Sequence, residues 1–561
     1  MPSHSAKPQG LPRTPRWATL IAAFSLAGLC ACGGGGGGGA ASAPAPAPTP
    51  APPPPPMVDV SPVAVTNTSS ALAANWQRGA FMEIYVRGYN DSDGDGHGDL
   101  RGLINKLDYL RDLGITGIWL MPVTRSQDHD HGYAVTDYRD IETAYGSLAD
   151  LDELLRQAHA RGIGVILDYV MNHSAGQHPL FLNSSYAADN AYRNWYVWQN
   201  PAPTGWSIYG GNPWRTSSTG SYFAPFWDQM PDFNLRNTAV VNWHQDNLRF
   251  WMNRGVDGFR FDAVGNLVEN GPAAWENQPE NYTLMRGINT LVAGYSNRYM
   301  VCEAPADPQG FGASTACGGA FAFDLQSHVV RAAKGDTAAL ATVTNYFKTA
   351  PVGMATMVSN HDSFAGQRLW DQVAGNITQY RLAAATYLLL PGTPFVYYGE
   401  EVGMAGGANL QGDAALRTPM SWTNDTTRAG FTTGTPFRGV SANVASQNVQ
   451  AQLADPQSLL SFYKAILNLR KGRPSLSVGS YLAPQVSGTV MAWQRSQGGE
   501  RSLVLINVGT AAATVPVASL PANARLTELY PGSTTLSAAD ASGNASISVP
   551  AQSLRIIDVL P

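Results

Sequence analysis

The sequence predicts an α/β fold: a (β/α)₈ TIM barrel with an inserted domain after strand 3 and a C-terminal antiparallel β-sandwich domain. Three observations predict it. From about residue 75, short apolar runs alternate with amphipathic helical stretches, as in a parallel sheet buried on both faces. An aromatic-rich segment, 173–235, interrupts this alternation, and after residue 473 short alternating strands with Gly and Pro turns take over. A doubly wound sheet would show the same alternation, so the pattern alone leaves both topologies open.

Eight segments have the composition of buried strands: residues 81–86, 116–120, 164–168, 258–262, 299–303, 320–324, 355–360 and 395–398. Three helices are expected from their apolar faces and end signals: residues 100–114, 147–162 and 455–472. Ser147 with Asp150 three residues later predicts a capped start for the second helix. Asp455-Pro456 predicts the start of the third.

The chain divides into six expected parts. They are a lipoprotein signal peptide (1–31), a Gly/Ala/Pro-rich tether (32–74), the first part of the barrel (75–172), inserted domain B (173–235), the second part of the barrel (236–473) and the C-terminal β-domain (474–561). The tether cannot bury enough apolar surface to fold, so we expect it to act as a spacer.

The net charge and the composition indicate which kinds of binding partner to expect. The 561 residues carry a net charge of −5, with 14% charged and 10% aromatic residues. This composition is typical of a folded globular protein and gives no electrostatic attraction to nucleic acid or anionic lipid. Few charges and many aromatic rings suit a neutral ligand such as a sugar.

The N-terminus has the pattern of a secretion signal. Basic residues precede an apolar run, 17–29, that is too short to span a bilayer. The following Leu29-Cys30-Ala31-Cys32 resembles a bacterial lipobox, which implies cleavage before Cys32 and lipidation of its thiol; ordinary signal cleavage nearby is the alternative. Gly33, the residue after the expected lipidated cysteine, favours localisation of the protein at the outer membrane. The lipid would be the protein's only contact with the membrane. In such an oxidising compartment Cys302 and Cys317 can pair, although their spacing alone does not establish it.

Polar residues recur at the carboxyl ends of the predicted strands, where barrel enzymes place their catalytic groups. These residues are Asp168, Asn172 and His173 after strand 3, Arg260 and Asp262 on strand 4, Glu303 on strand 5, and His361 and Asp362 after strand 7. Three converging carboxylates are the set that glycoside hydrolysis needs. One attacks the anomeric carbon, one protonates the leaving oxygen, and a third stabilises the oxocarbenium-like state.

The motifs around these residues resemble the four conserved regions of the α-amylase family, glycoside hydrolase family 13. The matching runs are Asp168-Tyr-Val-Met-Asn-His173, Gly258-Phe-Arg-Phe-Asp262, Glu303 and Ser359-Asn-His-Asp362, in the family's order. The resemblance covers about residues 75–561. It implies a retaining hydrolase of α-glucans that needs no organic cofactor.

The resemblance also implies residue roles. Asp262 would be the nucleophile, Glu303 the general acid/base, and Asp362 the carboxylate that binds and distorts the sugar at the cleavage site. The expected substrate-binding residues are His131, Tyr133, His173, Arg260, His361 and Arg417. Asp168 is expected to be a structural hydrogen-bonding group, and Asn172 either a Ca²⁺ ligand or a loop cap.

A second motif predicts a structural Ca²⁺ site between the first strand and its helix. Alternating acidic residues and glycines bring hard oxygen ligands together in a tight loop. The candidate ligands are Asp91, Asp93, Asp95, His97 and Asp99, with His97 contributing its backbone carbonyl. Gly102 stands where an EF-hand would need Glu, so the loop instead resembles that of oligo-1,6-glucosidase-like members. A merely solvated acidic turn is the alternative.

Met230-Pro-Asp-Phe-Asn234 resembles the form found in a group intermediate between oligo-1,6-glucosidases and neopullulanases. The favoured activity is α-1,4-glucan hydrolysis of the α-amylase type. The alternatives are an α-glucosidase, cyclomaltodextrinase/neopullulanase or transglycosylase acting on short α-glucosides, and a non-catalytic glucan-binding lipoprotein. Two departures affect the leaving-group side: Gly265-Asn266 replaces a Lys-His pair common in amylases, and Cys302 replaces a usual Gly. The oligomeric state stays open.

Overall fold

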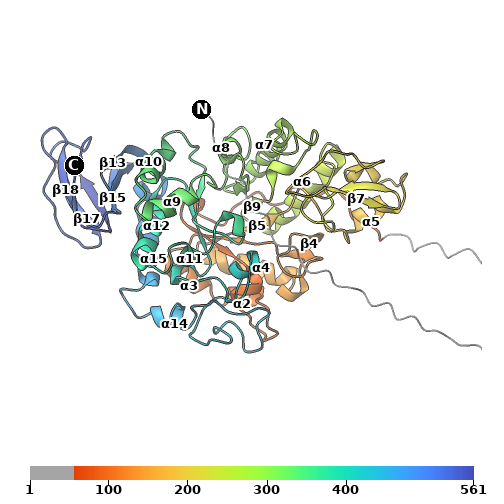
Figure 1. Cartoon of the computed structure of the whole chain (residues 1–561), viewed down its shortest axis with the longest axis horizontal. Helices are drawn as coiled ribbons and strands as arrows, with labels where there is room; N and C mark the ends of the chain where they lie inside the picture. Colours follow the sequence, from red (N-terminus) through yellow and green to blue (C-terminus); the bar gives the residue numbers. More distant parts are fainter. Residues whose placement is uncertain (1–55) are drawn as a thin grey trace, which may run out of the picture. The chain divides into compact units, whose positions relative to one another are not determined.

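The computed structural model describes residues 56–561 (Figure 1). The predicted signal peptide, the lipidation site Cys32 and the first part of the tether therefore lie outside the described residues. Within 56–561, no helix is both long enough and apolar enough to cross a membrane.

Seven parallel strands form the central sheet, in the order β10-β9-β5-β2-β1-β12-β11. They are β1 (Phe81–Ile84), β2 (Gly117–Leu120), β5 (Gly164–Tyr169), β9 (Gly258–Phe261), β10 (Tyr299–Cys302), β11 (Ala355–Thr356) and β12 (Thr393–Tyr397). The predicted strand at 320–324 is not a regular strand. Ala320 instead bridges to Cys302 and Phe321 to Ala355, which joins the two ends of the sheet. The sheet is thus a nearly closed barrel, and the doubly wound alternative is excluded.

Alternation along β1 shows how the strands fill both sides of the barrel. Phe81 belongs to an apolar cluster with Trp119, Phe321 and Phe395, which come from around the ring. Met82 and Ile84, with the opposite parity, belong to the larger cluster packed against the surrounding helices. This period-two division explains why the strands read as continuous apolar runs.

The helices confirm some predicted ends and correct others. The region predicted as one helix at 100–114 is two helices, α2 (Leu100–Ile104) and α3 (Leu107–Leu113), while α4 (Leu148–Ala160) has the predicted Ser147/Asp150 capping box. The third helix, α15 (Leu459–Gly472), begins after Ser458 and not at Asp455-Pro456. The Ser458 hydroxyl accepts from the backbone N–H of Ser461, so this later cap determines the start. Further helices around the barrel include α6 (Thr238–Arg254), α7 (Pro279–Ala293), α9 (Gln326–Ala333), α10 (Thr337–Asn345) and α12 (Ile377–Leu389).

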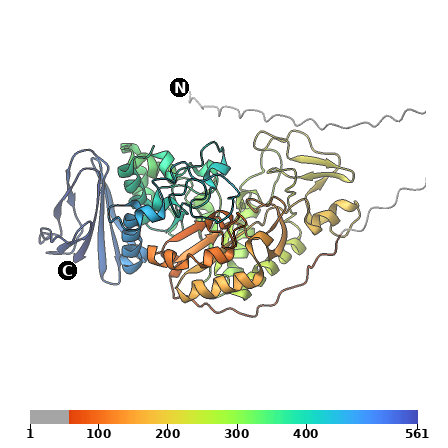
Figure 2. The same cartoon turned by 90° about the horizontal axis from the view of Figure 1, so that it is seen from below.

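Two further units are built from antiparallel strands. Between β5 and α6, α5 (Pro179–Tyr186) precedes a small sheet of β6 (Trp198–Gln199), β8 (Gly220–Phe223) and β7 (Trp214–Ser217). The C-terminal unit, blue in Figure 2, has a five-stranded sheet and a two-stranded sheet around their own apolar core. Its strands are β13 (Ser480–Ser487), β14 (Val490–Gln497), β15 (Glu500–Asn507), β16 (Ala513–Val517), β17 (Arg525–Tyr530), β18 (Ala545–Val549) and β19 (Ser553–Leu560).

Part of the segment assigned to the tether is hydrogen-bonded to the barrel. The backbone N–H of Val63 donates to Asp246, and the Asn253 amide donates to the carbonyl of Ala64. Both partners lie on α6. These long-range bonds anchor the chain before β1 begins.

Candidate active site

Arg260 joins three buried carboxylates at the carboxyl ends of neighbouring strands. Its guanidinium lies 2.8 Å from Asp168 of β5, 2.7 Å from Asp262 after β9 and 2.8 Å from Glu303 after β10. The backbone N–H of Ala263 also donates to Glu303, at 2.9 Å. Because β5, β9 and β10 are adjacent and parallel, side chains that are distant in sequence converge on one cation.

The charge balance of this cluster favours a protonated Glu303. One guanidinium cannot neutralise three buried carboxylates, so a proton shared among them lowers the electrostatic cost. Burial raises the pKa of Glu303, Arg260 opposes the rise, and the charges of Asp262 and Asp362 add to it, bringing the value to about 7. Burial raises the pKa of Asp262 too, while Arg260 lowers it. Glu303 thus keeps its proton near neutral pH, while the Arg260 cation favours the ionised form of Asp262. This difference suits Glu303 as a general acid and Asp262 as a nucleophile.

A second charged cluster surrounds Asp362. The His361 imidazole lies 2.5 Å from Glu83 through Nδ1 and 3.0 Å from Asp362 through Nε2, and Arg417 donates to Asp362 at 2.8 Å. Burial lowers the pKa of His361, but the charges of Asp362 and Glu83 raise it to about 10. His361 is therefore an imidazolium at neutral pH, and with Arg417 it holds the pKa of Asp362 below its usual value despite burial.

Glu83, on β1, was not among the site residues predicted from the sequence. It is 1% exposed, and its partner His361 lies 278 residues further along the chain. A carboxylate inside the apolar run Phe81-Met-Glu-Ile is a detectable signal, because a buried charge needs a partner.

Tyr133 connects the two charged clusters. Its hydroxyl donates to Asp168 at 2.9 Å and lies 2.7 Å from Nε2 of His361, with the two rings stacked. His131 packs beside the Tyr133 ring, at 5.7 Å between centroids, and accepts the backbone N–H of Tyr133. All the substrate-binding residues expected from the sequence thus lie in or beside this network. His173 lines the same cavity as Tyr133 and packs against Phe226, at 5.4 Å between ring centroids.

The carboxylates open into a cavity of about 730 Å³. Its lining is Tyr133, His173, Tyr209, Phe226, Met230, Asp262, Ala263, Asn266, Glu276, Glu303, Pro305, Ala306, Asp362 and Phe364. Burial lowers the pKa of His173 to about 4, so its ring is neutral, and its Nε2 has no hydrogen-bond partner within residues 56–561. Apolar walls, a neutral imidazole and three carboxylates at the base suit an uncharged, hydroxyl-rich ligand.

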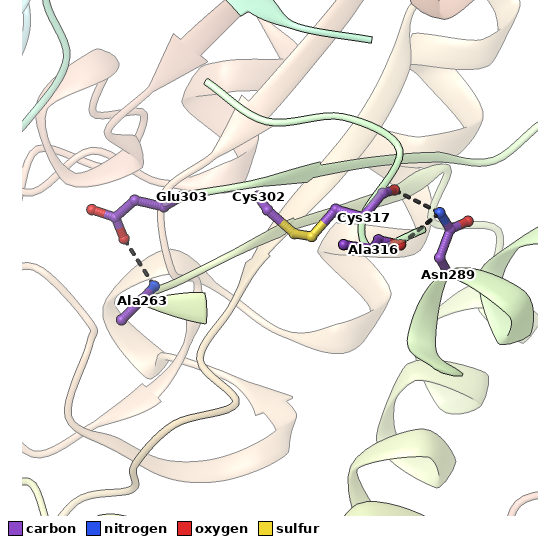
Figure 3. The surroundings of a disulfide bond; sticks show 6 residues. All are labelled: Ala263, Asn289, Cys302, Glu303, Ala316 and Cys317. Carbon is purple, nitrogen blue, oxygen red and sulfur yellow. Dashed lines mark hydrogen bonds between the residues drawn. A yellow bond between two sulfur atoms is a disulfide. The ribbon is translucent and has the colours of Figure 1, made fainter. Parts of the chain in front are cut away.

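Cys302 and Cys317 form a disulfide directly before Glu303 (Figure 3). Asn289 of α7 donates to the carbonyls of Ala316 and Cys317, which anchors the second half of the bridge. The pairing that the sequence left open is therefore present, and it links the end of β10 to the segment after α8 (Pro308–Gly312).

The acidic loop after β1 brings together three of its five candidate ligands. Carboxylate oxygens of Asp91, Asp93 and Asp99 lie within 4.8 Å of one another, a hard-oxygen set that can hold a metal ion. Asp95 lies outside this group and pairs with the His97 ring at 3.4 Å. Asp91 also accepts backbone N–H groups from Asp93, Gly94 and Gly96, so the loop is already folded around it.

A second group of oxygens lies buried between β5 and the insertion. Oδ1 of Asn172 and both carboxylate oxygens of Asp232 have no hydrogen-bond partner among the described residues. Burial raises the pKa of Asp232 well above its usual value and that of its neighbour Glu269 to about 8. These hard oxygen donors also fit a cation. Of the three residues, the sequence had indicated only Asn172.

Comparisons with known proteins agree with this geometry. A family model described as the α-amylase catalytic domain matches residues 83–479. Alpha-amylase 3 of Dictyoglomus thermophilum is 32% identical over 457 residues, covering 77% of this chain and 85% of that protein. The oligo-1,6-glucosidase of Parageobacillus thermoglucosidasius is 31% identical over 528 residues, covering 80% of this chain and 92% of that protein. The crystal structure of an α-amylase from H. orenii superimposes with a TM-score of 0.73 at 30% identity, covering 86% of this chain and 99% of that one. The chain therefore belongs to the α-amylase family, glycoside hydrolase family 13, and is a glycosidase that acts on α-glucans.

Proposed function

We propose that this enzyme hydrolyses α-1,4-glucosidic bonds in starch-derived glucans with retention of configuration. The observation that carries the proposal is the pair Asp262 and Glu303 on one guanidinium at the base of the cavity. Carboxyls that share a cation lie close together, as retention requires. An inverting enzyme needs them further apart, with room for a water molecule between them.

In the first step, an Asp262 oxygen attacks the anomeric carbon, and the bond from that carbon to the leaving oxygen breaks. Glu303 gives its proton to the leaving oxygen. In the second step, the Glu303 carboxylate takes a proton from water, the water oxygen attacks the anomeric carbon, and the bond to Asp262 breaks. Asp362, held by His361 and Arg417, binds the hydroxyls of the sugar being cleaved.

The pH dependence follows from the proton that Glu303 must hold. Since burial and neighbouring charges raise its pKa to about 7, kcat/KM should fall as the pH rises through about 7 and the acid ionises. Rates on maltotriose between pH 4 and 10 measure this. An alkaline limb that persists unchanged in Glu303→Gln would assign it to another group.

The α-amylase activity is supported by the similarity to Alpha-amylase 3 along most of the chain. An α-glucosidase, a cyclomaltodextrinase/neopullulanase or a transglycosylase on short α-glucosides is the second candidate, supported by the oligo-1,6-glucosidase relatives. Products from starch, maltooligosaccharides, cyclodextrin and sucrose distinguish them. We expect early mixed oligosaccharides and a fast fall in starch viscosity. Glucose as the only early product would contradict endo-cleavage.

Calcium is the metal we propose for the acidic loop, held by Asp91, Asp93 and Asp99 in a structural role. An ion that binds only the folded state stabilises it. Removal by EDTA should therefore lower the Tm by a few degrees, on the order of 5 °C, with recovery on adding Ca²⁺. The measurement is a thermal melt of the wild type with EDTA, with Ca²⁺ and with Mg²⁺.

Two variants test whether the ion lies in this loop. Asp93→Asn should remove most of the EDTA effect, whereas Asp95→Asn, a similarly exposed residue of the loop outside the cluster, should keep it. If Asp232→Asn alone removes the effect, the stabilising ion lies at the second oxygen group. A wild-type melt that EDTA leaves unchanged would refute the calcium proposal.

We further propose secretion and outer-membrane anchoring through lipid on Cys32. The support is the Leu29-Cys30-Ala31-Cys32 motif followed by a Gly-rich spacer. Labelling of cells with a fatty-acid analogue should modify the wild type, and Cys32→Ala should be unlabelled. Equal labelling of both would contradict the lipid site.

A further inference from the structure

The segment after Asp262 leaves room for a second loop to approach the reacting carboxylates. A Cβ atom built on Gly265 would lie 2.7 Å from Oδ1 of Asn277 and 3.6 Å from Cγ of Glu276. The Gly265 carbonyl accepts from the backbone N–H of Asn277, at 2.7 Å, and from the Asn281 amide. The missing side chain at 265 thus allows the loop at 270–278 to pack directly against the nucleophile segment.

This packing places Glu276 in the wall of the catalytic cavity. Glu276 lines it together with Asp262, Asn266 and Glu303. Its carboxylate has no hydrogen bond or ion pair within residues 56–561, and its partial burial raises its pKa. A half-buried carboxylate without a partner that faces a cavity has its acceptor capacity free for a ligand.

Tyr209 stands beside Glu276 at the tip of a tight turn. Ile208 and Gly211 exchange both backbone hydrogen bonds at 2.9 Å, and the two residues between them have positive φ, 49° at Tyr209 and 81° at Gly210. Such a turn costs a non-glycine residue strain, and here it presents a ring that is 63% exposed. The ring contacts Trp275 edge-on at 5.4 Å and Phe226 at 5.7 Å between centroids.

These groups lie on the leaving-group side of the cavity. Asp362 has its partners in His361 and Arg417, the cluster proposed to hold the sugar that is cleaved. Tyr209 and Glu276 instead line the cavity together with Asn266 and Glu303. Burial and the charges of Glu276 and Glu303 raise the pKa of Tyr209 to about 12. Because Glu303 protonates the leaving oxygen, the groups gathered around it face the unit that departs.

We propose that Glu276 and Tyr209 form the binding site for the leaving-group sugar, and that Glu276 selects a glycosyl leaving group over an aryl one. The carboxylate accepts hydrogen bonds from hydroxyls of the departing sugar, and the aromatic ring packs against its apolar face. This inference rests on the α-glucan hydrolysis proposed above. In a transfer reaction, a sugar acceptor attacks the glycosyl-enzyme, which is the reverse of the cleavage step. The same site would therefore bind the acceptor sugar.

The test compares two substrates with the same maltosyl glycone: maltotriose, which releases glucose, and 4-nitrophenyl α-maltoside, which releases nitrophenol. For Glu276→Ala we expect kcat/KM on maltotriose to fall about tenfold or more, because charged hydrogen bonds are lost. The fall on the nitrophenyl substrate should be several times smaller, since nitrophenol has no sugar hydroxyls. Tyr209→Ala should reduce both rates, because the ring packs against either leaving group.

Glu280→Ala serves as the matched control, because Glu280 lies four residues later, in the first turn of α7, and does not line the cavity. Thermal melts exclude unfolding of each variant. Equal losses on both substrates for Glu276→Ala, or no loss on either, would overturn the leaving-group site while leaving the hydrolase intact. A wild-type enzyme inactive on every α-glucoside would instead refute the proposed function.

Discussion

Asp262→Asn should lower kcat on maltooligosaccharides by about 10⁴-fold or more, the largest effect expected of any substitution in this chain. The amide cannot form the glycosyl ester, and Glu303 alone cannot replace the nucleophile. Arg260 keeps Asp168 and Glu303 as partners, so the fold should persist. Initial rates by reducing-sugar release measure the loss, and calorimetric titration with maltotriose should still detect binding.

Asp189→Asn provides the control, because this aspartate is exposed in the insertion. It should leave both rate and binding near wild type. Full hydrolysis by Asp262→Asn would show that another residue is the nucleophile. Loss of activity together with loss of thermal stability would be uninformative, so a melt accompanies each rate measurement.

Glu303→Gln should lower kcat on maltotriose by about 10²- to 10⁴-fold, the range expected for loss of a general acid. With α-glucosyl fluoride as substrate, the rate of the first step, formation of the glycosyl-enzyme, should fall much less, because fluoride leaves without a proton. Water attack then lacks its base, so the glycosyl-enzyme should accumulate. Added azide, which needs no base, should speed turnover and give α-glucosyl azide.

The azide product separates this role from a merely structural one. A variant that had lost the site's geometry would respond neither to the leaving group nor to azide. Equal losses on fluoride and maltotriose, with no azide adduct, would contradict the acid/base assignment of Glu303.

The convergence of Asp262, Glu303 and Asp362 could be predicted because it follows from topology. Residues at the carboxyl ends of parallel barrel strands meet at one face, so the strand pattern alone places them together. The same rule anticipated that Arg260 and Asp168 would adjoin them. The sequence also indicated the Ser147 cap and the end of α3 at Gly114, since both are local signals.

Other features depend on contacts that no local pattern encodes. The pairing of Glu83 with His361 spans 278 residues, and Asp232 meets Glu269 only because the insertion folds back on the barrel. The start of α15 was misplaced because two capping sequences, Asp455-Pro456 and Ser458, compete within four residues. Gly210-Gly211 is a local turn signal for the loop that carries Tyr209, but no local signal predicts that Tyr209 lines the same cavity as Glu303.

The most direct test of the central claim is to trap the covalent intermediate. Treatment with 5-fluoro-α-D-glucosyl fluoride, in the wild type and in Glu303→Gln, should attach one fluoroglucosyl group, and peptide mass spectrometry should place it on Asp262. An adduct on any other carboxylate would contradict the assigned nucleophile. A first product of β configuration, seen by proton NMR in the wild type, would contradict retention itself.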